Sequence, residues 1–118
     1  MISVVLNANK GNGSLELHMR GHADSGEYGK DLICASASIL AYTYAYEVDN
    51  KEPGFFLKEP IVSLEEGEAN ITCLTKTSDD FEEMLTIMSV IAHGFYVLMN
   101  EYPECVRIKL FGEAKSLI

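Results

Sequence analysis

His22 and Cys34 are the two residues of this chain whose side-chain types and spacing best fit a chemical role. A thiol becomes a strong nucleophile as its thiolate, and the thiolate is favoured by a neighbouring imidazole or by a helix N-terminus. A helix predicted to begin near Asp31 places Cys34 in its first turn, where N–H groups lack partners and the helix dipole is positive. This segment therefore offers a base, a nucleophile and an oxyanion-binding helix end.

Two residues of the predicted helix are candidates for supporting this pair. Asp31, or Lys30 just before it, is expected at the N-cap, where the Asp31 carboxylate would accept a backbone N–H and fix the first turn that carries Cys34. A catalytic acid is the less favoured alternative for Asp31. Ser38 lies one turn beyond Cys34, where packing or a hydrogen bond back into the helix is the ordinary explanation and direct participation the alternative.

The loop 23–30 between the two reactive residues is polar and rich in glycine. It has little apolar surface to pack against the rest of the chain, and glycine leaves its backbone free to move. Gly21, Gly26 and Gly29 are therefore the candidate hinges of a loop that gates substrate entry.

Every one of these residues also has a structural explanation. Cysteine is among the most buried residue types, and Cys34 would fit a small core position. His22 alone would more often be structural or at the surface. Cys73 and Cys105 stand in strand patterns and are expected in the core or on a face of the sheet. Composition alone favours the structural explanations, so only the relative positions of His22 and Cys34 can distinguish them from a catalytic role.

Composition limits the classes of function. The chain has 118 residues, 47% of them hydrophobic, which fits one domain spanning residues 1–118. Its 9 basic and 18 acidic residues give a net charge of −9, the wrong sign for direct nucleic-acid binding and the right one for a basic protein partner. No signal peptide or membrane span is recognised, so we expect a cytoplasmic protein. Three cysteines without close pairing argue against a disulfide framework or a metal site, and no cofactor is expected.

The elements that must position the two residues follow from hydrophobic periodicity and turn signals. The pattern predicts strands at 2–6 and 15–20, a helix at 31–48, strands at 61–64 and 69–74, a helix from 78 to about 102 and a strand at 106–110. The order ββαββαβ indicates an α+β fold, with a mainly antiparallel sheet of about five strands and two helices packed on one face. The uncovered sheet face or the first helix is a candidate homodimer surface.

Both helices are expected to be largely buried. In the second helix the stripe comprises Phe81, Met84, Leu85, Met88, Ile91, Ala92, Phe95 and Leu98 or Met99, and we interpret it as core. In the first helix the residues that recur at three- and four-residue steps are Leu32, Ala35, Ile39, Tyr42 and Tyr46. Ser78, Asp79 and Asp80 form a helix start, and Pro103 is expected to end the helix.

The segment around the reactive pair also resembles a known signature. Residues 21–23 (Gly-His-Ala), a loop, and residues 29–35 (Gly-Lys-Asp-Leu-Ile-Cys-Ala) followed by Ser36 and Ser38 are similar to the ribosomal-processing cysteine protease family, Prp. The resemblance extends over nearly the whole chain in length and element order.

Membership in that family would assign His22 as the base and Cys34 as the nucleophile of acyl transfer. It also implies a substrate, the short N-terminal extension of large-subunit ribosomal protein number twenty-seven, which is removed during ribosome maturation. The negative net charge of this chain would attract a positively charged ribosomal protein.

Three other hypotheses remain at this point. A non-catalytic factor that binds the ribosome or assists its assembly would use the same acidic surface. A redox-sensing protein would use Cys34 as its reactive thiol, although no resolving cysteine stands near it. A metal site at His22 and Cys34 would need at least one further ligand.

Overall fold

The computed structural model describes residues 1–22 and 30–118, with the side chain of Lys30 excluded. It confirms the predicted order of strands and helices and adds a short 3₁₀ helix, η1, at the end. The elements are β1 (Ile2–Asn9), β2 (Ser14–Gly21), α1 (Lys30–Asp49), β3 (Ile61–Glu65), β4 (Glu68–Leu74), α2 (Ser78–Glu101), β5 (Val106–Gly112) and η1 (Glu113–Ser116).

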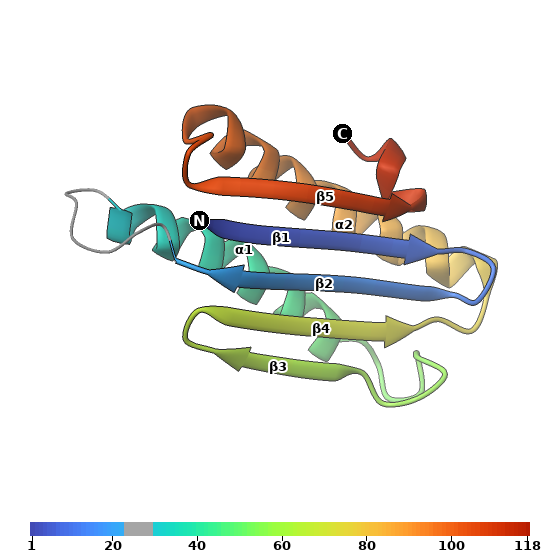
Figure 1. Ribbon diagram of the computed structural model, residues 1–118. Coiled ribbons are helices and arrows are strands. Elements are labelled where there is room, and N and C mark those ends of the chain that lie inside the picture. Colours follow the sequence, from blue (N-terminus) through green and yellow to red (C-terminus); the bar gives the residue numbers. More distant parts are fainter. Residues whose placement is uncertain (23–29) are drawn as a thin grey trace.

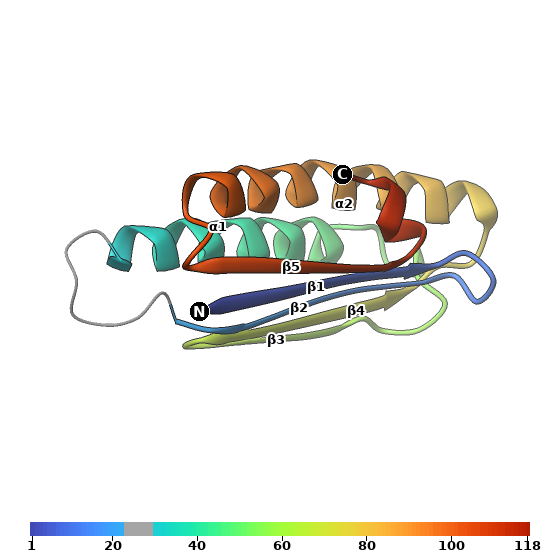
Figure 2. The same cartoon turned by 45° about the horizontal axis from the view of Figure 1, so that its top comes forward.

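The five strands form one sheet in the order β3-β4-β2-β1-β5. Neighbouring strands are antiparallel except β1 and β5, which pair in parallel with Ile2 opposite Val106. Both helices cover the same face of this sheet, so the α+β prediction is confirmed (Figures 1 and 2). Placing β4 beside β2 brings the β3–β4 turn next to the end of β2, where the predicted base lies.

The core lies between the sheet and the helices, as strand alternation predicts. In β1 and β2 the residues at every second position are buried, while those between them face away from the helices. His18 is on that uncovered face, where its Nδ1 lies 2.7 Å from Oδ1 of Asn70 on β4. His18 is therefore a strand surface residue and takes no part in the predicted site.

Helix α2 presents the predicted apolar stripe to the core. Its fully buried residues are Phe81, Met84, Met88, Ile91, Ala92 and Phe95. The helix starts at Ser78, and its N-cap is Thr77, whose Oγ1 accepts a hydrogen bond from the Asp80 N–H at 3.1 Å. The prediction thus placed the helix start correctly but missed the capping threonine. By length and composition α2 could also cross a membrane, a test that core helices pass as well. Because of its buried stripe we interpret it as a core helix.

The predicted stripe of α1 is on the wrong face. Tyr42 and Tyr46 are 44% and 69% exposed, and Leu32 and Ile39 are more than half exposed. The buried residues are mainly small, and Tyr44 is the largest of them. The remaining buried positions are Ile33, Ala37, Ala41, Ala45 and Val48. Alanines allow α1 to pack closely against its neighbours, and because large apolar residues occur all round the helix, periodicity alone did not identify the buried face.

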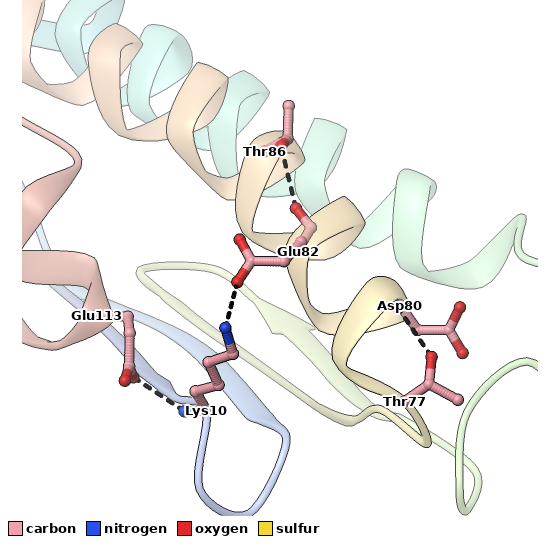
Figure 3. A network of polar contacts seen from close by, with 6 residues as sticks. All are labelled: Lys10, Thr77, Asp80, Glu82, Thr86 and Glu113. Carbon is pink, nitrogen blue, oxygen red and sulfur yellow. Dashed lines mark hydrogen bonds and ion pairs between the residues drawn. The ribbon is translucent and has the colours of Figure 1, made fainter.

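The opposite end of the molecule from the predicted site is held by polar contacts (Figure 3). Lys10, in the β1–β2 turn, contacts two elements that are distant in sequence. Its Nζ lies 3.1 Å from Oε1 of Glu82 on α2, and its backbone N–H donates to Oε2 of Glu113 on η1 at 2.9 Å. Because the ion pair is exposed, it contributes little energy, but it fixes the end of the hairpin relative to α2.

Candidate active site

His22 and Cys34 line the same cavity of about 360 Å³. The residues come from different elements, because His22 follows the end of β2 and Cys34 lies near the start of α1. Gly21, Asp31 and Ser38 line this cavity as well. Five of the residues that the sequence singled out are therefore brought together. Gly26 and Gly29, the other two candidate hinges, lie outside the described residues.

The backbone around His22 is held by both neighbouring strands. Gly21 ends β2 opposite Ile2 of β1, and its N–H donates to the carbonyl oxygen of Gly67 at 2.9 Å. The His22 carbonyl accepts a hydrogen bond from the Met1 nitrogen at 2.5 Å. The His22 side chain is exposed at the end of the sheet. Its main chain is thus fixed while its imidazole stays accessible to a substrate.

Gly21 has a close-packing role that the hinge prediction did not include. Its φ of 107° lies in the region that favours glycine, and a Cβ there would lie 2.2 Å from the Met1 carbonyl oxygen. No side chain fits between these two strands at this point. Gly21 therefore lets β1 approach the residue that precedes His22, and its role as a hinge stays a prediction.

Cys34 is the fifth residue of α1, because the helix begins at Lys30. It follows the first turn directly, and Cα–Cβ bonds tilt toward a helix N-terminus, so its side chain extends back over that turn. The expectation that Asp31 caps the helix is wrong, since Asp31 already lies within the first turn. An acidic residue is favourable there too, because its charge complements the helix dipole. Cys34 is half-buried, and Ser38 follows it by one turn on the same face.

Sequence reasoning did not assign six further cavity-lining residues to the site: Ile2, Met19, Ala37, Tyr42, Glu66 and Gly67. Glu66 and Gly67 belong to the β3–β4 turn. The sequence marked this segment as a turn, but no local signal showed that it lies against the end of β2. Only the pairing of β2 with β4 brings it there.

The other two cysteines are in the core, as the strand patterns predicted. Cys73 and Cys105 are 2% and 4% exposed. Burial raises the pKa of the Cys73 thiol to about 11, an effect that the hydroxyl of Tyr44 beside it partly offsets. Cys73 is consequently protonated at neutral pH and does not act as a nucleophile. Among the described residues no three histidine, cysteine or acidic side chains gather into a group suited to a metal ion.

Residues 1–107 match the sequence profile of a family described as Cysteine protease Prp. The chain belongs to this family. It is accordingly a cysteine protease with the α+β architecture of the Prp structures.

Prp relatives match over nearly their whole length. Two strains of Staphylococcus aureus, Mu50 and NCTC 8325, have a protein named ribosomal processing cysteine protease Prp. Each is 28% identical to this chain over 110 residues, covering 92% of this chain and 97% of the relative. The family resemblance that the sequence suggested is therefore confirmed.

Solved structures show the same fold. The Staphylococcus aureus Prp protease with a covalently linked product peptide gives a TM-score of 0.64 at 25% identity, covering 93% of this chain and 99% of that one. The same protease with a substrate peptide gives a TM-score of 0.66 at 23% identity over the same shares. A protein from Streptococcus mutans gives a TM-score of 0.63 at 26% identity, covering 94% of each chain.

Proposed function

We propose that this protease removes the short N-terminal extension of large-subunit ribosomal protein number twenty-seven during ribosome maturation in the cytoplasm, with Cys34 as nucleophile and His22 as base. The observation that carries the proposal is that His22 and Cys34, from separate elements, line one cavity in a chain of the Prp family. The relatives named as ribosomal processing proteases supply the class of substrate.

The proposed reaction is acyl transfer. His22 takes the proton of the Cys34 thiol, and Sγ attacks the scissile carbonyl carbon to form a tetrahedral oxyanion. N–H groups of the first turn of α1 are the donors for this oxyanion. Collapse breaks the C–N bond, and His22 returns its proton to the departing amine, leaving a thioester on Cys34. Water then attacks the thioester, releasing the carboxylic acid and restoring the thiol.

The relative solved with a covalently linked product peptide supports this scheme, because acyl transfer forms a bond between enzyme and product. In this chain Tyr42 and Met19 line the cavity beside Cys34 and provide apolar surface for an extended peptide. The homodimer and the absence of direct nucleic-acid binding stay predictions.

Mass spectrometry of the extended ribosomal protein, incubated with each enzyme variant, tests the proposal. Wild type is expected to release the extension, and Cys34→Ala and His22→Ala to leave it intact. Cys73→Val is the matched control: it also removes a thiol, but one buried away from the cavity, so cleavage is expected to persist. Cleavage at the wild-type rate by both site variants would refute the dyad. No cleavage by wild type would refute this substrate and leave the substrate of the protease to be found.

A further inference from the structure

The β3–β4 turn lies directly against the imidazole of His22. The φ of Gly67 in this turn is 75°, and its Cα has no side chain facing the ring. A Cβ at Gly67 would lie 2.6 Å from Nε2 and 2.9 Å from Cε1 of His22. Real Cβ atoms essentially never approach other atoms so closely. The ring therefore occupies the space that any side chain at position 67 would need.

The same turn also holds the backbone of the strand that carries His22. The carbonyl oxygen of Gly67 accepts the hydrogen bond from the Gly21 N–H, directly beyond the last β2–β4 pair, Arg20 with Glu68. One glycine thus contacts the His22 segment twice, through its carbonyl at the main chain and through its bare Cα at the ring. Gly67, His22 and Cys34 line the same cavity, so a shift of the ring against the turn would also change its position relative to the sulfur.

We propose that Gly67 is a positioning residue for the protease, whose missing side chain seats the His22 imidazole on the β3–β4 turn and holds it toward Cys34. The inference rests on the proposed role of His22 as base. Gly67 has no side chain that could take part in the reaction, so it acts through His22. A misplaced base lowers the rate of the chemical step, because proton transfer depends steeply on the distance between donor and acceptor.

Gly67 also has a backbone conformation that only glycine adopts easily. The effect of losing this conformation has to be separated from the effect of displacing the His22 ring. Gly54 provides the matched control. Its φ of 84° is close to that of Gly67, and a Cβ there would meet nothing within 4 Å. Gly54→Ala and Gly67→Ala therefore impose similar backbone strain, and only the second displaces the His22 ring. Gly67→Asn adds a variant with less strain, since asparagine tolerates positive φ but still carries a Cβ.

The experiment measures kcat and KM on the extended peptide together with the imidazole Hε1 resonance of His22, assigned with His22→Ala. Gly67→Ala and Gly67→Asn are expected to lower kcat by about 100-fold with little change in KM, and to shift the His22 resonance. Gly54→Ala is expected to match wild type in all three measurements.

Two results would overturn the inference: a folded Gly67→Asn with the kcat of wild type, or Gly67 variants whose His22 resonance stays at the wild-type position. The resonance needs no substrate. If wild type fails to cleave the peptide, the proposed function fails while the resonance still decides whether Gly67 positions the imidazole.

Discussion

Alkaline pH should destabilise this protein through the buried Cys73 thiol. The pKa of Cys73 is raised from 9.0 to about 11 by burial, and the pKa of Tyr44 beside it is raised as well, first by burial and then by Cys73. A raised pKa means that the folded state holds the proton more tightly than the unfolded chain. The contribution of the protonated thiol to the free energy of unfolding is therefore fully present below about pH 8, and it is lost as the pH rises from about 9 to 11.

The size of the effect follows from the difference of about 2 pKa units. One unit corresponds to about 1.4 kcal/mol, so the thiol should lower the free energy of unfolding by about 1.4 kcal/mol at pH 10 and by at most about 3 kcal/mol at higher pH. Cys73→Val keeps the site apolar and removes the titrating group. Groups that do not contact Cys73 cancel when the pH dependence of the two proteins is compared. Tyr44 loses the effect of Cys73 in the variant, but burial, the larger cause of its raised pKa, acts in both proteins.

Urea unfolding followed by circular dichroism at about pH 7.5 and pH 10 measures this difference. Wild type should lose about 1.4 kcal/mol more than Cys73→Val between the two pH values, with the urea dependence of the free energy alike in both. The same loss in wild type and variant would refute the reasoning, because it would mean that the thiol can ionise without unfolding.

Two further predictions concern a helix cap and a strand end. Thr77→Ala should lower the free energy of unfolding in urea by about 1 kcal/mol because it removes the cap of α2. Thr86→Ala, whose hydroxyl donates to the Glu82 carbonyl on the exposed face of the same helix, should be neutral or stabilising; equal losses would contradict the capping role. Gly21→Ala should lower the free energy of unfolding by more than about 2 kcal/mol and abolish cleavage, since its Cβ would meet the Met1 carbonyl. Gly54→Ala, which also has a positive φ but open space around its Cβ, is the control, and an active, stable Gly21→Ala would disprove the close-packing role.

The order of elements could be predicted because its signals are local. The alternation in β2 and the apolar stripe in α2 each involve residues only a few positions apart in the sequence. Both patterns predicted the buried residues correctly. The face of α1 could not be predicted in this way. Tyr44 is fully buried while Tyr42 and Tyr46 are exposed, and these tyrosines differ only in where the sheet and α2 lie relative to the helix.

The residues of the candidate site also differ in whether a local sequence pattern could identify them. His22 and Cys34 flank one loop, so a sequence pattern could connect them, and the structure places them on one cavity. Gly67 joins them only through the register of β4 against β2, which no local pattern contains. The position of Asp31 was also mispredicted. Aspartate is favourable both at an N-cap and in the first turn of a helix, so its residue type could not distinguish the two positions, and in the structure it lies in the first turn.

The parallel pairing of β1 with β5 constrains how the protein is made. Ile2 pairs with Val106, so β1 gains its second neighbour only from β5, about a hundred residues later in the sequence. Until β5 pairs with it, β1 remains at the edge of the sheet. Pairing of two strands so distant in sequence closes a long loop, so we expect it to be a slow, late step of folding. Because β1 also supports the segment that holds His22, we infer that a nascent chain gains a complete active site only after β5 has emerged.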